Sequence, residues 1–291
     1  MDGKRVAMLA LSMSAAAIPV MGYALSIPLR ICYEKVTFKN LPSYLRGLKI
    51  LHIADLHGRS PHKMNFNIWP AINQLNVDMA VLTGDVVLDK ANQIYPHLEG
   101  LKALCKKVPV FYVDGNHENE CYNEMADLLS GIGVTVLYNR QGDFAVGSVE
   151  SGASKVVSVT GFRDYEYLSR NKFKGVSPLL DNMSAKGGFH VVLTHQPQIF
   201  DWLCKTNASS INSNFSALVL AGHTHGGQIR LPFFPTLYAP GQGVLPKYGD
   251  GWYEESDGQL KLFISRGVGA THFWLRTFNP SEVAVIELQK D

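Results

Sequence analysis

Five short islands of metal-binding side chains are spread through the sequence, and each one follows a run of apolar, β-branched residues. Such a run predicts a buried strand, so the polar island after it lies in the loop at the carboxyl end of that strand. Open α/β sheets place their ligand sites at this edge, where residues far apart in the sequence meet. The islands are Asp55-Leu56-His57, Gly84-Asp85, Gly115-Asn116-His117-Glu118, His195 and Gly222-His223-Thr224-His225.

The islands combine hard oxygen donors with imidazole nitrogens, a mixture that suits Mn, Fe or Zn. An Asp-x-His or Gly-Asp pair alone is more typical of a turn with a capping aspartate. The pair His223 and His225, two positions apart among glycines, has no packing rationale and favours a metal site. Together the islands supply enough oxygen and imidazole ligands for two metal ions that share a bridge. Such a pair suits hydrolysis of a phosphate ester.

The elements that must position these islands alternate between strands and helices in the first half of the chain. The strands predicted there are 48–53, 79–83, 108–113 and 134–137. The helices predicted between them are 64–76, 91–107 and 119–130. This order predicts a parallel sheet with helices packed outside it. The strands predicted in the second half are 143–146, 155–160, 191–194, 217–220, 260–265 and 283–288.

The bulk properties of the 291-residue chain fit one large globular domain or two small ones. Its formal net charge is +2, which argues against a surface built to bind nucleic acid. Four cysteines without a CxxC pair exclude a zinc knuckle and a dense disulfide framework. Free thiols are the expected state, and one disulfide stays open as an alternative for an exported domain.

The N-terminal region differs from the rest, because residues 6–28 carry no charge and follow Lys4 and Arg5. A run of this length can span a bilayer, so it predicts a single hydrophobic helix that anchors the chain in a membrane. Two alternatives are a signal segment cleaved near Gly22-Tyr23-Ala24 before export, and a buried helix of a soluble protein. Basic residues flank the run on both sides, so they do not decide which side of the membrane the domain faces.

Taken in this order, the islands resemble the calcineurin-like metallophosphoesterase superfamily, and within it the anchored or exported bacterial phosphodiesterases of the YkuE and YaeI type. The resemblance runs from about residue 49 to residue 288 and includes GHTHGGQIR at 222–230, SRGVG at 265–269 and PSEV at 280–283. It implies an α/β fold in which a sandwich of two mixed β-sheets is flanked by helices. It also implies an N-terminal anchor or signal segment with its linker at 1–41, in the bacterial inner membrane, and a catalytic domain at 42–291.

The resemblance further implies a role for each island. The ligands implied for the first divalent ion are Asp55, His57 and His225. The ligands implied for the second are Asn116, His195 and His223. Asp85 resembles the carboxylate that bridges both ions, and His117 the histidine that protonates the leaving alkoxide or stabilises the phosphoryl oxygens. Leu88 stands where purple acid phosphatases of the superfamily carry a tyrosine, so an iron–tyrosinate centre is not expected and Mn, Fe, Zn and Mg stay open.

The implied activity is that of a membrane-associated phosphodiesterase in which a metal-bridging hydroxide attacks phosphorus. Its substrate is a phosphate diester, open between lipid-linked and nucleotide-linked compounds. One alternative is a UDP-2,3-diacylglucosamine pyrophosphatase of lipid A biosynthesis, and another is a metal-stabilised interaction scaffold without catalysis. Weaker candidates for binding a phosphate group, with surface salt bridges as the competing interpretation, are Arg59, Arg163, Arg266 and Arg276.

Overall fold

The structure is a computed structural model of the whole chain. The residues that it describes are 29–58, 67–146, 155–164, 177–209, 215–231, 233–269 and 276–291. The hydrophobic helix predicted at 6–28 and the side chain of Arg59 lie outside these ranges. Within the described residues, no helix combines the length and the apolar character needed to cross a bilayer.

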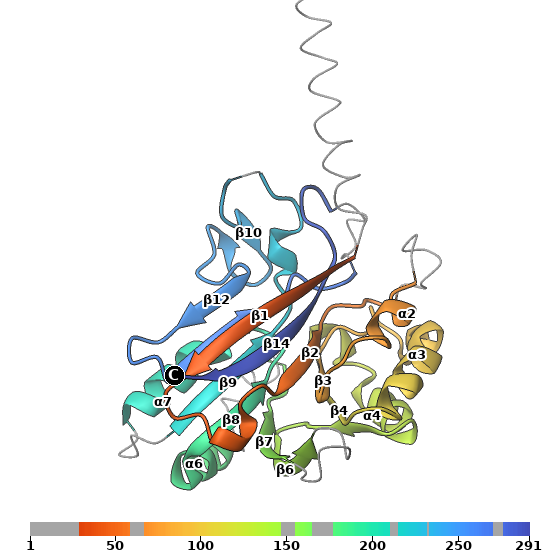
Figure 1. Cartoon of the computed structure of the whole chain (residues 1–291). Helices are drawn as coiled ribbons and strands as arrows, with labels where there is room; N and C mark the ends of the chain where they lie inside the picture. The colour runs from red at the N-terminus through yellow and green to blue at the C-terminus, as the bar shows by residue number, and fades with distance from the viewer. Residues whose placement is uncertain are drawn as a thin grey trace, which may run out of the picture.

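The first of two six-stranded sheets has the strand order β1-β14-β2-β3-β4-β5 (Figure 1). Its strands are β1 (Arg30–Phe38), β2 (Lys49–Ile53), β3 (Met79–Thr83), β4 (Val110–Val113), β5 (Val134–Val136) and β14 (Glu282–Lys290). Strands β2 to β5 are parallel to one another, as the alternation of predicted strands and helices implies. Strand β14 runs antiparallel to β2 and parallel to β1, so the sheet is mixed.

The second sheet has the order β12-β13-β9-β8-β7-β6. Its strands are β6 (Arg140–Val146), β7 (Lys155–Gly161), β8 (Gly188–Leu193), β9 (Phe215–Ala221), β12 (Gly251–Glu254) and β13 (Leu260–Ile264). The four central strands are parallel, and the two edge strands β6 and β12 are antiparallel to their neighbours. The predicted fold class, two mixed sheets flanked by helices, is therefore confirmed.

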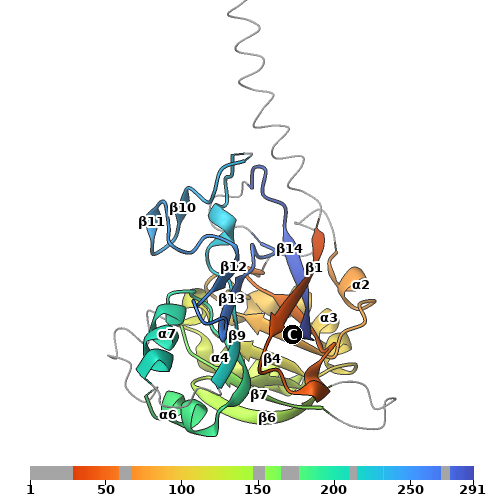
Figure 2. The same ribbon diagram turned by 60° about the vertical axis from the view of Figure 1, so that its left-hand side comes forward.

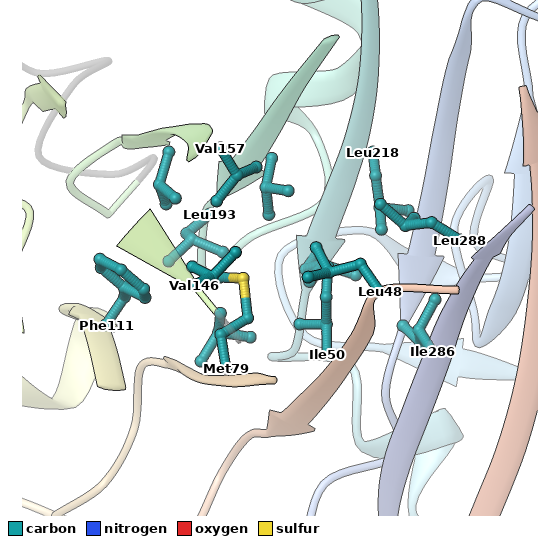
Figure 3. Packing of buried hydrophobic residues seen from close by; sticks show 14 of the residues in the cluster. Leu48, Ile50, Met79, Phe111, Val146, Val157, Leu193, Leu218, Ile286 and Leu288 are labelled. Atoms are coloured by element: carbon teal, nitrogen blue, oxygen red, sulfur yellow. The ribbon is translucent and has the colours of Figure 1, made fainter. Parts of the chain in front are cut away.

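The main core lies between the two sheets and takes side chains from both (Figure 3). Ile50 and Met79 of the first sheet face Leu193 and Leu218 of the second in one buried cluster. The neighbouring residue Leu51 belongs instead to the cluster beneath the helices of the first sheet, because successive side chains of a strand point to opposite faces. Central strands buried on both faces explain why the sequence shows continuous apolar runs there.

Helices cover the outer face of each sheet (Figures 1 and 2). The first sheet is covered by α2 (Trp69–Ile72), α3 (Tyr95–Cys105) and α4 (Tyr122–Gly131). The second is covered by α6 (Ser177–Lys186) and α7 (Ile199–Ser209). Short 3-10 turns complete the chain: η1 (Ser43–Leu45), η2 (Ala91–Ile94), η3 (Asn116–Glu118) and η5 (His225–Gly227). Of the helix predicted at 64–76, the described residues contain only α2.

Three features depart from the predicted elements. Strand β1 lies inside the segment 1–41, where no strand was predicted, because the long apolar run before it dominates the local pattern. It pairs with β14 along its whole length, so the sheet begins before residue 42, and the division into anchor and catalytic domain stays a prediction. Helix α6 was also not predicted. No strand was predicted between residues 220 and 260, where the structure has a small hairpin of β10 (Tyr238–Ala239) and β11 (Gly243–Val244) and the edge strand β12.

Candidate metal centre

The carboxyl ends of five strands deliver the predicted islands to one place. Loops after β2, β3 and β4 carry the islands of the first half, and loops after β8 and β9 carry the histidines of the second. Backbone hydrogen bonds join neighbouring loops. The amide of His57 donates to the carbonyl of Asp85 (2.8 Å), and the amide of Gly222 donates to the carbonyl of His195 (3.0 Å). These bonds extend the backbone hydrogen bonding of each sheet into the loops that form the site.

The side chains of these loops form three groups, in each of which the potential ligand atoms lie within 4.8 Å of one another. The groups are Asp55–His57–His225, His57–Asp85–His117 and Asp85–His195–His223. Asn116 joins the third group, because its Oδ1 lies 3.2 Å from Nε2 of His195. The structure therefore brings together all seven predicted metal ligands and the predicted catalytic histidine, and it links the groups through His57 and Asp85.

One half of the site converges on His195, which is fully buried. Its Nδ1–H donates to the carbonyl of Thr83 (2.8 Å), which directs Nε2 toward Oδ2 of Asp85 (3.1 Å). Burial lowers the pKa of His195, but the charge of Asp85 outweighs it, and the pKa lies well above its ordinary value. The amide oxygen of Asn116 and the carboxylate of Asp85 thus both lie beside Nε2 of His195, where a positive charge, carried by the ring or by a metal ion, is favoured.

The other half consists of Asp55, His57 and His225, all of them buried. Nε2 of His225 lies 3.0 Å from Nε2 of His57 and 3.6 Å from Oδ1 of Asp55. Burial, followed by the nearby His57, lowers the pKa of His225 well below its usual range, so its imidazole is neutral. Burial also raises the pKa of Asp55 to about 7. Two imidazoles, one of them neutral, beside a buried carboxyl group are a donor set that fits a divalent cation.

Asp85 lies between the two halves. Burial disfavours its charged form, but the charges of His195, His57 and His117 outweigh burial and hold the pKa of Asp85 well below its usual range. Its Oδ2 lies 3.1 Å from Nε2 of His195 and 3.9 Å from Nε2 of both His57 and His117. This carboxylate is therefore placed to contact cations on both sides.

Backbone strain is concentrated at the site. Ten described non-glycine residues have positive φ, a region that L-residues disfavour, and half of them are predicted ligands. These five are Asp55 (55°), His57 (53°), Asp85 (51°), His223 (72°) and His225 (52°). Each such residue costs roughly 1–3 kcal/mol, and such residues cluster at functional sites. The loops after the strands therefore turn sharply so that consecutive polar side chains point to one centre.

Glycines allow the loops to approach the two aspartates. A Cβ atom at Gly115 would lie 2.2 Å from Oδ1 of Asp85. A Cβ atom at Gly267, where φ is 69°, would lie 2.6 Å from Oδ2 of Asp55. The glycines that flank the islands therefore have a steric reason, since any side chain there would displace a carboxylate.

The family profile described as Calcineurin-like phosphoesterase matches residues 48–227, more than half of the chain. The chain belongs to this family. The match spans every predicted ligand, from Asp55 to His225, and the enzyme is a metal-dependent phosphoesterase.

Three curated relatives of this phosphoesterase illustrate its range. It is 29% identical to the uncharacterized metallophosphoesterase YkuE of Bacillus subtilis, over 86% of this chain and 82% of the relative. It is 26% identical to phosphodiesterase YaeI of Escherichia coli, over 82% of each chain. It is 25% identical to a zebrafish transmembrane protein with metallophosphoesterase domain, over 90% of this chain but 58% of the relative. Three other relatives, about 30% identical, are likewise matched over only 61–63% of their length.

Glu118 of the phosphoesterase had no predicted role, and the structure shows what it contacts. It is fully buried, and its Oε2 accepts the amides of Gly115 (2.7 Å) and Asp85 (2.9 Å), while Oε1 accepts the amide of Val87 (2.9 Å). Burial, followed by the charge of Asp85, raises its pKa to about 8. The signal in the sequence is an acidic residue three positions after Gly115, the spacing of a helix-capping carboxylate.

Arg276 and Asn279 support the opposite side of the site, where they donate to backbone carbonyls. Nδ2 of Asn279 donates to the carbonyl of His225 (2.6 Å). Arg276 donates through Nε to the carbonyl of Gly269 (2.9 Å) and through Nη2 to that of Gly267 (3.1 Å), and its Nη2 lies 3.4 Å from Nδ1 of His225. Arg276 therefore contacts the backbone and a ligand from outside the three groups.

The two other described arginine candidates engage carboxylates of the protein. Arg163 is buried, pairs with Asp114 (2.8 Å) and lies 4.3 Å above the ring of Tyr122. Arg266 donates through Nε to Oδ2 of Asp250 (2.8 Å). The structure does not bring either guanidinium into the three ligand groups, and their role in binding substrate stays a prediction, as does that of Arg59.

Proposed function

We propose that this phosphoesterase hydrolyses phosphate diesters with two divalent metal ions, and that residues 6–28 attach it to a membrane. The observation that carries the proposal is the convergence of six potential ligands on either side of the Asp85 carboxylate. The name of its relative YaeI, a phosphodiesterase, supports a diester over a monoester. The uncharged length of residues 6–28 supports the membrane attachment.

The ligands divide between two ions as follows. Asp55, His57 and His225 would hold one ion, Asn116, His195 and His223 the other, and Asp85 would contact both. When bound, such ions lower the pKa of a water molecule and offset charge on phosphoryl oxygens. Mn, Fe, Zn and Mg all accept this mixture of donors.

His117 is the residue best placed to handle the proton of the reaction. Its Nδ1–H donates to the carbonyl of Leu88 (2.5 Å), which turns Nε2 toward the ligand groups. Its side chain is 19% exposed, whereas that of Asp85, 3.9 Å from its Nε2, is 3% exposed. A substrate can therefore reach this imidazole from solvent, and its Nε2–H can donate to the leaving alkoxide.

A substrate screen tests the proposed reaction. Full-length protein loaded with each metal is assayed on bis(p-nitrophenyl) phosphate, p-nitrophenyl phosphate, a cyclic nucleotide and UDP-2,3-diacylglucosamine. We expect the diester to be cleaved faster than the monoester. Preferred cleavage of the nucleotide-sugar lipid would instead favour the lipid A reaction, and a fully metal-loaded protein inert toward all four compounds would favour the scaffold.

Substitution of His117 separates catalysis from metal binding. His117→Ala is expected to lower kcat on the diester by about 10²–10⁴-fold, because it removes a general acid. Elemental analysis should find the metal content of native protein, since His117 is not among the seven proposed ligands. Native turnover in this variant would contradict the assignment.

A further inference from the structure

An exposed apolar surface covers the segment 229–245, which we call the apolar hairpin because it contains β10 and β11. Of the eleven large apolar side chains that are exposed in the described part of the chain, seven lie in it. They are Ile229, Leu231, Phe233, Phe234, Tyr238, Val244 and Leu245. The sequence contains no charged residue between Arg230 and Lys247. This surface therefore lacks the charged groups that normally keep an exposed loop in water.

The polar groups of the apolar hairpin point inward, to the turn that carries a predicted ligand. Nη1 of Arg230 donates to the carbonyl of Gly226 (3.3 Å) and pairs with Asp250. Oγ1 of Thr236 donates to Oδ1 of Asp250 (3.0 Å). Because Gly226 belongs to η5 directly after His225, the inner side of the apolar hairpin rests on the metal site and its apolar side faces out.

The backbone at two exposed positions makes a large side chain costly. Phe233 has a φ of 68° and Leu245 a φ of 53°, where glycine or asparagine is the usual residue. Phe233 is fully exposed and Leu245 is 70% exposed, so neither side chain contributes burial that offsets this strain within the chain. Contact with an apolar environment outside the chain would account for both.

The described chain begins beside the base of the apolar hairpin. The amide of Arg230 donates to the carbonyl of Thr277 (2.9 Å), and the amide of Arg30 donates to the carbonyl of Ser281 (2.8 Å). Thr277 and Ser281 are four residues apart, which limits their Cα separation to about 14 Å. Both views accordingly show β10 and the start of β1 at the same end of the molecule (Figures 1 and 2).

We propose that the apolar hairpin inserts into the surface of the same bilayer in which residues 6–28 anchor the chain. The inference rests on the membrane part of the proposed function. A lipid surface fits this patch better than a second copy of the chain, because a protein interface carries a charged and polar rim that 231–246 lacks. Phenylalanine, tyrosine and leucine are also the side chains that bind at the headgroup boundary.

Insertion would set the metal site against the membrane. The apolar hairpin and η5 are joined through Gly226, so lipid contact by the hairpin places His225 close to the headgroups. A phosphate diester in a lipid headgroup could then reach the ligand groups while its acyl chains stay in the bilayer. The surface thus favours lipid-linked over soluble diesters as the substrate class.

Fluorescence quenching in vesicles tests the contact. Full-length Phe233→Trp and the control Tyr95→Trp are reconstituted into vesicles of phosphatidylethanolamine and phosphatidylglycerol, with or without brominated phosphatidylcholine. Tyr95 is 56% exposed and begins α3 on the outer face of the first sheet. We expect bromolipid to quench the added tryptophan at 233 and to leave the one at 95 unquenched, relative to the native chain with its four tryptophans.

The outcomes separate this contact from the other proposals. Equal quenching of the two variants, in protein that floats with the vesicles, would overturn the contact and leave the anchor intact. Protein that does not float would overturn both. A cross-link between copies through residue 233, without quenching, would assign the surface to self-association and also overturn the contact. Hydrolysis of bis(p-nitrophenyl) phosphate in the same samples shows independently whether the enzyme is active.

Discussion

The loops after β3 and β4 are held by an acid, whereas the loop after β9 is held by a cation and an amide. On the first sheet, buried Glu118 accepts backbone amides of the Asp85 and Gly115 loops. On the side of the second sheet, Asn279 donates to the carbonyl of His225, and Arg276 donates to carbonyls of the neighbouring loop that begins at Arg266. The sharp turns leave backbone amides without backbone partners on the side of the first sheet, and Glu118 accepts them. On the side of the second sheet the turns leave carbonyls, to which Asn279 and Arg276 donate.

The difference teaches that the two proposed metal positions differ in the groups that support them. Glu118 fixes the loops of Asp85 and Asn116, while Asn279 fixes the loop of His225. Only Asp85 serves both positions. Variants of these residues should therefore weaken either both ions or one of them, and the pattern of loss tests the comparison directly.

The largest effect is expected at the shared carboxylate. Asp85→Asn removes the charge that faces both halves, so it should release both ions and lower kcat/KM on a diester by about 10³-fold or more. Metal content and turnover check this. Asp89→Asn is the matched control, because Asp89 is exposed and contacts only Gln93 among the hydrogen bonds described, and it should change neither. A normal metal content in Asp85→Asn would contradict the bridging role.

A smaller and uneven effect is expected at Glu118, because the loop of Asp85 serves both proposed ions whereas that of Asn116 serves only one. Glu118→Gln replaces one carboxylate oxygen by an NH₂ group that faces a backbone donor, so the loops of Asp85 and Asn116 should shift. Loss of such a supporting group typically costs 10–100-fold in metal affinity. Titration with a chelator should show one ion released before the other, unlike in the control Glu124→Gln on the exposed side of α4. Equal weakening of both ions would show that the two supports are not independent.

A still smaller effect on the opposite ion is expected at Asn279. Asn279→Ala removes the donor to the carbonyl of His225, and we expect about tenfold weaker binding of the ion assigned to Asp55, His57 and His225. The ion assigned to Asn116 should be retained. Anomalous scattering from crystals soaked at limiting metal would identify which position empties first, and loss from the Asn116 side would reverse the assignment.

The smallest effect on activity is expected at Asp250, which lies beneath the apolar hairpin outside both supports. Although burial opposes ionisation, Arg230 and Arg266 lower its pKa below the ordinary value of 3.8. A lowered carboxyl pKa adds stability that is present above pH 4 and is lost as the pH falls through the folded-state pKa. Asp250→Asn should therefore lower the unfolding free energy by about 1–3 kcal/mol near pH 7. Denaturant titrations at pH 7 and at a pH below the folded-state pKa of Asp250 should show that the difference in unfolding free energy disappears in acid.

Much of the site could be predicted because its ligands lie in loops directly after strands that the sequence predicts. Parallel strands point their carboxyl ends to one edge, so Asp55, Asp85 and Asn116 had to meet once their strands were recognised. The spacing of Glu118 indicates a cap for the Gly115 loop, but it does not show that Glu118 also accepts the amide of Asp85, nor that Asn279 donates to the carbonyl of His225. Arg163 illustrates the reverse problem, since its buried partner Asp114 depends on strands that meet only in the folded chain.

The outlying parts of the fold were hidden by stronger neighbouring signals. Strand β1 follows a long apolar run and was absorbed into it, although it pairs with β14 along its whole length. The apolar hairpin lies in sequence rich in proline and glycine, which predicts irregular chain but not which side chains stay exposed. Exposure is a property of the whole packing, so it required the structure.

The pairing of β1 with β14 also determines when the first sheet can form during biosynthesis. Arg30 lies opposite Glu282, about 250 positions later, so β1 leaves the ribosome long before the strand that pairs with it. At roughly 5–20 residues per second, β1 waits roughly 12–50 s for that neighbour. The nascent chain therefore cannot complete its first sheet until β14 has been translated, and a message truncated before β14 would leave β1 without its partner strand.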